Sequence, residues 1–267
     1  MDLKLNGKRA LVTGSSSGIG AAIAKLLAAE GASVVVHGRS SERALQIAQE
    51  IASAGGKAFV AVGDLSADKS AQAVASEVLS ALGGVDILVN NAGGPESLGW
   101  MDVSPDGWTR IYNTNVISMV RMIQQFVPTM KKQGWGRIIQ ISSCVATQPF
   151  ASMPHHSAAK TAVLNLTVSL AKELAETGIT VNTVSPGVIV TPGAERYFRE
   201  MAKAKGWGED WKTIERHVLL SILYNPTGHL GTVGDVAALV AFICSPLSGY
   251  INGANLRVDG GSTGTIN

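Results

Sequence analysis

Short runs of β-branched residues alternate along the chain with longer Ala- and Leu-rich stretches of helical periodicity, and this alternation constrains the fold most. The runs predict seven strands, at residues 9–13, 33–37, 57–62, 86–90, 137–142, 180–185 and 254–258. The stretches between them predict helices near 18–30, 41–54, 67–82, 106–132, 155–176 and 233–244. Because strands separated by helices pair in parallel, we expect an α/β fold with a doubly wound, seven-stranded parallel sheet.

Length, composition and charge suit one domain of this kind. The chain has 267 residues, of which 46% are hydrophobic and 16% charged, as expected for a sheet buried on both faces. No repeat or linker divides residues 1–267, so we expect a single domain. The formal charge of +2 is spread along the chain, which predicts neither a nucleic-acid partner nor a membrane surface. Without a recognisable signal peptide or spanning segment, a cytoplasmic location is expected.

One connection, residues 187–232, is too long for an ordinary turn between strand and helix. It has helical periodicity at 194–205 and 210–223. Long connections with structure of their own usually form lids or binding loops, so we predict a helical substrate lid. Its aromatic residues either line a substrate pocket or pack the lid against the body or another subunit: Tyr197, Phe198, Trp207, Trp211 and Tyr224.

A glycine-rich turn follows the first predicted strand. From Thr13 to Gly20 the sequence reads TGSSSGIG. Where such a turn enters a helix, backbone N–H groups and the helix N-terminus face one point, which suits a pyrophosphate. Three residues separate the first two glycines, unlike the GxGxxG spacing, but the position after strand one is that of a Rossmann dinucleotide site.

Three later strand ends carry further candidates. Arg39 follows the second strand, where an acidic residue would favour NAD; the arginine favours the 2′-phosphate of NADP, with NAD possible and a solvated cation as the alternative. Asp64 follows the third strand, and Asn91 follows the fourth within NNAG. Alone, Asp64 is explained as a helix cap and the asparagines as turn formers. All lie where open α/β sheets bind ligands.

Together the motifs TGxxxGIG, NNAG, TNV, a Ser pair at 142–143, SAAK and SPG resemble those of the short-chain dehydrogenase/reductase family, over residues 7–261. The resemblance implies a homo-oligomer, a dimer or tetramer, that transfers hydride between NAD(P) and a small-molecule alcohol or ketone. No metal site is expected. The expected cofactor-binding residues are Gly14, Ser16, Ser17, Gly18, Ile19, Gly20, Arg39, Asp64, Leu65, Asn91, Ala92, Gly93, Lys160, Pro186, Gly187, Val188 and Ile189.

By the same resemblance, four residues are catalytic. Asn115 would hold a water in a proton relay, Ser143 would hydrogen-bond the substrate oxygen, and Lys160 would bind the nicotinamide ribose. His156 occupies the place of the tyrosine of the family's YxxxK motif, which is a departure from the pattern.

A histidine at the acid/base position changes the expected chemistry. Its ordinary pKa is roughly 6.5, against about 10 for tyrosine, so near a lysine it is mostly neutral at pH 7. A neutral imidazole is a usable base and a weak acid. The substitution therefore favours alcohol oxidation over ketone reduction at neutral pH, and reduction should rise below about pH 6.5.

Several alternatives stay open. In the first, His156 is a working acid/base residue. In the second, it is inactive in a cofactor-binding protein with little or no turnover. In the third, it takes no part in the reaction, and Ser143, His155 or a lid tyrosine is the acid/base residue. An enzyme that keeps its cofactor bound while catalysing a proton transfer or elimination is a further alternative. We expect His155 at the surface or the pocket rim rather than at a metal. Cys144 and Cys244 have no paired spacing and are expected to be reduced thiols.

Overall fold

The computed structural model describes residues 1–265 around a central sheet of seven parallel strands. The seven predicted strands are confirmed, with ends within one residue of those expected. They are β1 Arg9–Val12, β2 Ser33–Gly38, β3 Lys57–Val62, β4 Ile87–Asn90, β5 Gly136–Ile141, β6 Ile179–Pro186 and β9 Asn255–Val258.

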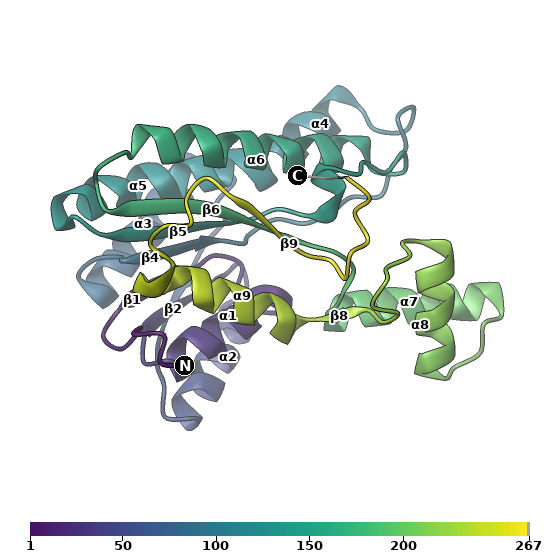
Figure 1. Ribbon diagram of the computed structural model, residues 1–267, viewed down its shortest axis with the longest axis horizontal. Coiled ribbons are helices and arrows are strands. Elements are labelled where there is room, and N and C mark those ends of the chain that lie inside the picture. Colours follow the sequence, from purple (N-terminus) through teal and green to yellow (C-terminus); the bar gives the residue numbers. More distant parts are fainter. Residues whose placement is uncertain (266–267) are drawn as a thin grey trace.

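Helices cover both faces of this sheet (Figure 1). One face packs against α1 Gly18–Ala29, α2 Ser41–Ser53 and α9 Val233–Cys244. The other packs against α3 Asp68–Leu82, α5 Ser118–Gln133 and α6 Pro154–Glu173. Because both faces are buried, the strands are continuous apolar runs rather than alternating ones. The doubly wound α/β fold is confirmed.

The strand order fixes where a ligand binds. It runs β3-β2-β1-β4-β5-β6-β9, so the chain reverses direction across the sheet between β1 and β4. At such a switch point the loops that leave the two strands diverge and open a crevice at their carboxyl ends. The loop Thr13–Gly20 and the segment NNAG follow these two strands.

The predicted single helix at 106–132 is divided in the structure. It consists of α4 Pro105–Tyr112, a π-helical turn at Asn113–Ile117, and α5. A π-turn inserts one residue into the helical repeat and is frequently found at functional sites. Here it carries Asn115, one of the expected catalytic residues.

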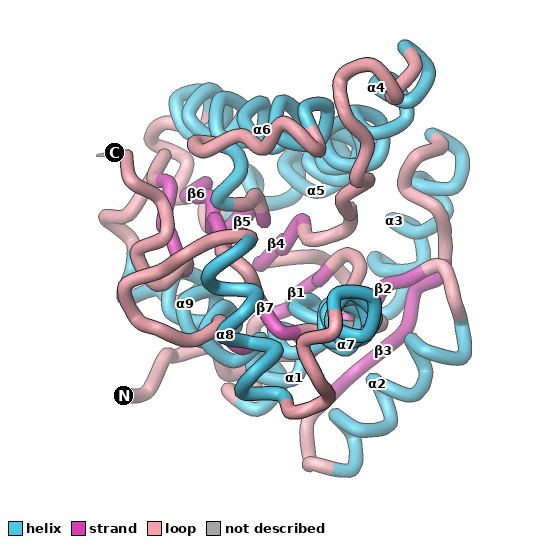
Figure 2. Tube along the Cα trace, turned by 90° about the vertical axis from the view of Figure 1, so that its right-hand side faces the viewer, coloured by secondary structure: helices cyan, strands magenta, loops and turns pink. Residues whose placement is uncertain are grey.

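The two helices expected at 187–232 are present as α7 Pro192–Lys205 and α8 Trp211–Ser221, and they have an apolar cluster of their own. They stand beyond the carboxyl edge of the sheet in Figure 1, and Figure 2 faces the side that carries them. A small sheet of β7 Ile189–Val190 and β8 Gly231–Thr232 joins them to the body. This sheet was not predicted, because two-residue strands have no detectable periodicity.

Short 3₁₀ turns at Cys144–Ala146 and Pro246–Ser248 complete the described elements. Both cysteines are free, as expected, and both are buried. Among residues 1–265, no helix is both long enough and apolar enough to cross a membrane.

Candidate active site

The glycine-rich loop is held by the loop after β4. Thr13 Oγ1 accepts hydrogen bonds from the backbone N–H groups of Asn91 (2.9 Å) and Ala92 (3.0 Å). In return, Asn91 Nδ2 donates to the carbonyl oxygens of Thr13 (2.9 Å) and Gly14 (3.1 Å). Asn91 therefore shapes the loop in addition to lining the cleft beside it.

Two glycines of this loop leave no room for a side chain. Gly14 has a φ of +66°, and a Cβ there would lie 2.9 Å from Ala92 Cα. A Cβ at Gly20 would lie 2.5 Å from Asn91 Nδ2 and 2.6 Å from the Gly14 carbonyl oxygen. The two glycines thus let the loop pack closely against itself and against the segment after β4.

We expect Gly20→Ala to lower the free energy of unfolding by about 1–3 kcal/mol, because the added methyl overpacks the loop. NADPH affinity should fall with it. Urea denaturation and NADPH fluorescence titration measure the two effects. Gly234→Ala is the matched control, since Gly234 lies in the first turn of α9 and a Cβ there meets only Thr232 Oγ1, at 3.5 Å. Equal losses in both variants would contradict the close packing assigned to Gly20.

His37, which the sequence argument did not single out, braces the same loop from β2. Its Nδ1 accepts a hydrogen bond from the Gly14 N–H (3.1 Å), and its Nε2 lies 3.2 Å from the Gly63 carbonyl oxygen. Since that oxygen can only accept, the proton is on Nε2 and the ring is neutral. Burial lowers the pKa of His37 to about 4. The one available signal was a histidine inside an otherwise apolar strand.

Arg39, Asp64 and Leu65 lie at the outer strand ends. Arg39 is exposed, and Leu65 is buried. The pKa of Asp64 is lowered by hydrogen bonds from Ser66, with a smaller contribution from the charge of Arg39. Arg39 therefore lies near the carboxyl end of β3, where it is free to meet a ligand.

A cleft of about 1010 Å³ runs from the glycine-rich loop to the lid. Most of the expected site residues line it: Gly14, Ser17, Ile19, Gly20, Asn91, Gly93, Ser143, His156, Lys160, Pro186, Gly187, Val188 and Ile189. The other expected residues of the described chain are outside its lining: Ser16, Gly18, Arg39, Asp64, Leu65, Ala92 and Asn115. The sheet thus brings segments far apart in the sequence to one cavity.

Lys160 is fixed between β5 and α6. Its Nζ donates to the Ile141 carbonyl oxygen (2.9 Å), and its own carbonyl oxygen accepts from Ser142 Oγ (2.8 Å). Burial lowers the pKa of Lys160 to about 8. The neighbouring Ser143 accepts a hydrogen bond from the Val145 N–H (3.4 Å) and lines the cleft. Lys160 is therefore a positioned cation at neutral pH.

His156 lines the same cleft and is 5% exposed. Burial, then the charge of Lys160, then that of His155 lower its pKa to about 3. The neutral state of His156 at pH 7 agrees with the expectation. Because imidazolium forms only near its pKa, the expected rise in the rate of ketone reduction shifts from pH 6.5 to about pH 3. Within residues 1–265, His156 Nδ1 is buried without a hydrogen-bond partner. Nothing in that range orients the ring as a carboxylate would.

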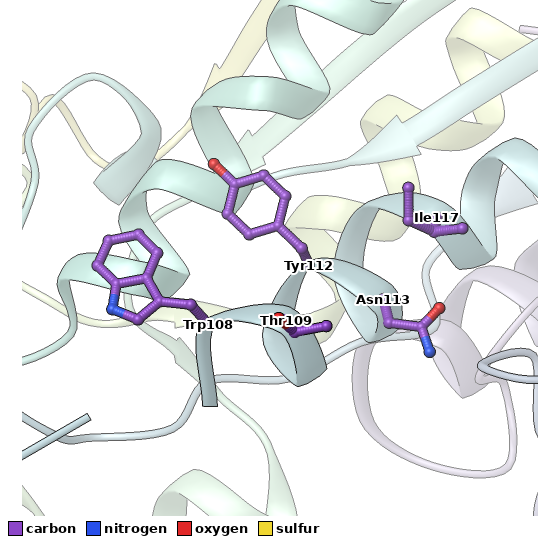
Figure 3. Close-up of a pocket in the computed structure, with 5 residues that line it drawn as sticks. All are labelled: Trp108, Thr109, Tyr112, Asn113 and Ile117. Atoms are coloured by element: carbon purple, nitrogen blue, oxygen red, sulfur yellow. The ribbon is translucent and has the colours of Figure 1, made fainter. Parts of the chain in front are cut away.

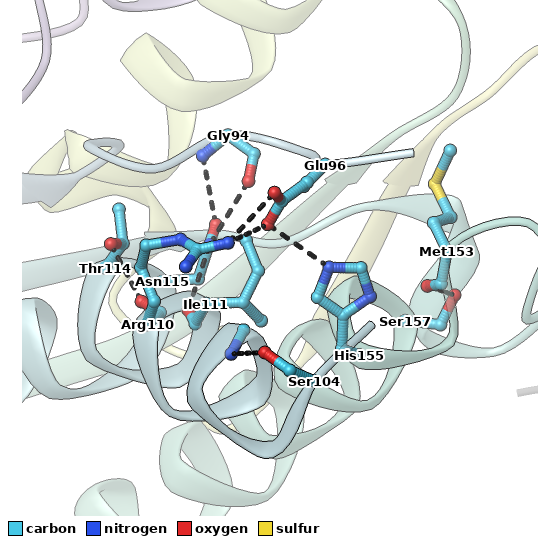
Figure 4. A network of polar contacts seen from close by, with 11 residues as sticks. Gly94, Glu96, Ser104, Arg110, Ile111, Thr114, Asn115, Met153, His155 and Ser157 are labelled. Atoms are coloured by element: carbon cyan, nitrogen blue, oxygen red, sulfur yellow. Dashed lines mark hydrogen bonds and ion pairs between the residues drawn. The ribbon is translucent and has the colours of Figure 1, made fainter. Parts of the chain in front are cut away.

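The expectation for His155 was wrong, because its side chain is fully buried. Figure 4 shows the polar network around it. His155 Nε2 lies 3.6 Å from Glu96 Oε2, and its ring packs against Trp108. Arg110 Nη2 bonds both oxygens of Glu96 at 2.9 Å. α4 covers this side of α6, so His155 faces protein rather than solvent.

Asn115 is fully buried in the π-turn and holds a wall of the cleft (Figure 4). Its Nδ2 donates to the carbonyl oxygens of Gly94 (3.2 Å) and Ile111 (3.1 Å), and its Oδ1 accepts from the Gly94 N–H (3.1 Å). Both amide hydrogens are thus used by the backbone. One Oδ1 lone pair is left for the water of the expected relay.

Two of the five lid aromatics line the cleft, and the contacts of Trp207 and Trp211 are within the lid itself. Tyr197 and Phe198 line the cleft. Trp207 stacks on His217 at 4.8 Å, Trp211 lies under Arg199, and Tyr224 is exposed. None of these three residues lines the cleft.

In residues 1–265, no group of His, Cys, Asp or Glu side chains is arranged to hold a metal ion.

A separate hollow of about 500 Å³ lies along α4 and the π-turn (Figure 3). It is lined by Trp108, Thr109, Tyr112, Asn113 and Ile117. It shares no lining residue with the main cleft. None of the expected site residues lines this hollow.

Known proteins resemble the chain over its whole length. A family model described as short chain dehydrogenase matches residues 8–202. An uncharacterized oxidoreductase of Bacillus subtilis is 38% identical, covering 98% of each chain. A 3-oxoacyl-(acyl-carrier-protein) reductase of Vibrio cholerae is 38% identical, covering 97% of this chain and 98% of that one. The crystal structure of L-sorbose reductase from Gluconobacter frateurii, complexed with NADPH and L-sorbose, superimposes with a TM-score of 0.94 at 33% identity and full coverage of both chains.

The family match, the relatives and the superposition agree with the geometry of the cleft. The glycine-rich loop, NNAG and Lys160 meet at the carboxyl edge of a seven-stranded sheet in the order the motifs predict. The chain belongs to the short-chain dehydrogenase family and is an NAD(P)-dependent oxidoreductase.

Proposed function

We propose that the protein interconverts a secondary alcohol and a ketone with NADP, and that His156 occupies its acid/base position. The observation that carries the proposal is the meeting of the glycine-rich loop with Ser143, His156 and Lys160 in one cleft. A dinucleotide bound along the loop would bring its reactive ring to these three side chains.

The residues present fit such a cofactor. Gly14 and Gly20 line the cleft on the tight loop that leads directly into α1, where a helix N-terminus suits a pyrophosphate. Arg39 supplies an exposed guanidinium at the carboxyl end of β2. NADP is the cofactor that this arrangement favours, in agreement with the NADPH of the sorbose reductase structure. When bound, it supplies or accepts the hydride.

The chain's own residues manage the oxygen and the proton. Ser143 would hold the substrate oxygen, and Lys160 would hold the ribose hydroxyls through the hydrogens that Ile141 leaves unused. His156, neutral at pH 7, would accept the alcohol proton during oxidation. Asn115 would keep Gly94 and the adjoining cleft wall in place.

A second candidate function is cofactor binding with little or no turnover. Two observations favour it: the pKa of His156 is lowered to about 3, and its Nδ1 has no partner within residues 1–265. An imidazole in this state is a weak base and a weaker acid. The protein would then have a regulatory or structural role.

NADPH consumption and NADPH formation on a mixed panel of ketones and alcohols test the two functions. Turnover in either direction supports the oxidoreductase. Tight NADPH binding without turnover on the panel supports the second function and contradicts the first. Product without net change in NADPH would indicate an elimination or proton transfer at the same site.

Arg39→Ala should weaken NADP binding by about 10- to 100-fold and leave NAD binding nearly unchanged, because only NADP carries the 2′-phosphate. Titration of both cofactors measures this. Arg43→Ala, an exposed arginine on α2, serves as the matched control. Equal losses for NADP and NAD in the Arg39 variant would contradict the assigned specificity.

We also propose a single domain and a homo-oligomer. The continuous seven-stranded sheet supports the first proposal, and the match to the short-chain dehydrogenase family supports the second. The cytoplasmic location expected from the sequence remains a prediction.

A further inference from the structure

The substrate end of the cleft is apolar. Beyond Ser143 and His156, toward the lid, residues from the loops before α4 and α6, from α7 and from the end of α8 line it. The apolar members of this lining are Val145, Pro149, Phe150, Met153, Tyr197, Phe198, Met201 and Ile222. Its polar members are uncharged serines, Ser97, Ser152 and Ser221.

Charge is confined to the other end of the cleft. Among its lining residues in the described chain, Lys160 and His156 are the only basic side chains, and arginine, aspartate and glutamate are absent. Lys160 Nζ bonds Ile141 and lies 3.8 Å from the place of a Cβ on Gly93, in the half formed by the glycine loops. His156 is neutral at pH 7 because its pKa is lowered to about 3, mainly by burial.

This distribution has a consequence for substrate charge. A carboxylate or phosphate that entered the substrate end would lose its hydration and meet no cation there. An uncharged molecule with an apolar body would instead cover the side chains of Phe150, Met201 and Ile222, which favours binding. The preference for uncharged over anionic substrates would thus come mainly from the absence of a cation at the substrate end of the cleft.

We infer that the substrate is an uncharged ketone or secondary alcohol with an apolar body, rather than a carboxylate or a phosphate ester. The inference rests on the proposed function, since it assigns a substrate class to the same site. The residues that set it are the lid side chains, with Met201 of α7 as the position where a cation would reverse it.

A pair of ketones that differ mainly in charge tests this. We expect kcat/KM with NADPH at pH 7 to be at least about 100-fold higher for methyl 3-oxobutanoate than for 3-oxobutanoate, as expected for burying an unpaired charge. In a second pair, 4-phenyl-2-butanone should be preferred over butanone. Equal or higher activity on the acid would overturn the inference.

Met201→Lys sharpens the test by adding the missing cation. It should lower the ester-to-acid ratio at least about 10-fold through improved activity on the acid. Met201→Gln, polar but uncharged, is the matched control and should leave the ratio near that of the native protein. An unchanged ratio in the lysine variant, with normal thermal unfolding, would contradict the role given to the lid.

Failure of the proposed function is distinguished by calorimetry on the NADPH-loaded protein. If neither ketone turns over, the oxidoreductase proposal fails, but binding of the ester without the acid would still support the substrate class. If both bind equally, or neither binds, the inference fails as well.

Discussion

Replacing His156 with tyrosine is expected to raise the rate of ketone reduction at pH 7 by about 100-fold, the contribution typical of one well-placed acid/base group. The pKa of His156 is lowered to about 3, so almost no imidazolium is present to give a proton at neutral pH. A tyrosine hydroxyl carries its proton at pH 7, and the nearby Lys160 would favour its release. NADPH oxidation from pH 5 to 9 measures the effect.

His156→Phe is the matched control, because it fills the same space without an exchangeable proton. If His156 occupies the acid/base position, the phenylalanine variant should lose whatever activity the native protein has, in both directions. A native protein that reduces ketones faster than the tyrosine variant across this pH range would contradict the assignment. Activity in the tyrosine variant alone would favour cofactor binding as the native role.

Replacing Lys160 with methionine should lower kcat/KM by about 1,000-fold and weaken NADPH binding in the same variant. Methionine has a similar length but neither the charge nor the donors that Lys160 directs at Ile141 and the cleft. The expected weakening comes from lost contacts at the ribose rather than at the phosphates. Lys172→Ala, an exposed lysine on the same helix, is the control and should bind NADPH normally.

The pH dependence of NADPH binding supplies an independent check on Lys160. Its pKa is lowered to about 8, so the side chain is a cation below that pH and neutral above it. Affinity in the native protein should therefore fall as the pH rises through about 8, and the methionine variant should show no such fall. Fluorescence titration from pH 6 to 10 follows both proteins. Parallel curves would remove Lys160 from the cofactor site.

The sequence predicted the helices of the lid but not the side chains that the lid directs into the cleft. The two lid helices follow from local periodicity, and the structure has both. The sequence did not predict which lid aromatics face the cleft, because nothing in the local pattern distinguishes Tyr197 from Trp211. The way α7 and α8 pack decides it: Tyr197 lines the cleft, and Trp211 lies under Arg199.

The sequence by itself determined the seven strands, the helices between them and the order of the motifs, because β-branched runs, helical periodicity and glycine turns are local properties. They also placed the motifs at the carboxyl ends of strands, whereas the strand order that puts the switch point between β1 and β4 came from the structure. Only the tertiary structure decided the π-turn at Asn113–Ile117, the bracing of the glycine loop by His37, and the burial of His155 beneath Glu96 and Trp108. These depend on contacts between residues far apart in the sequence. The low pKa of His156 was settled in the same way, because burial, its largest cause, exists only once α6 is packed against the rest of the fold.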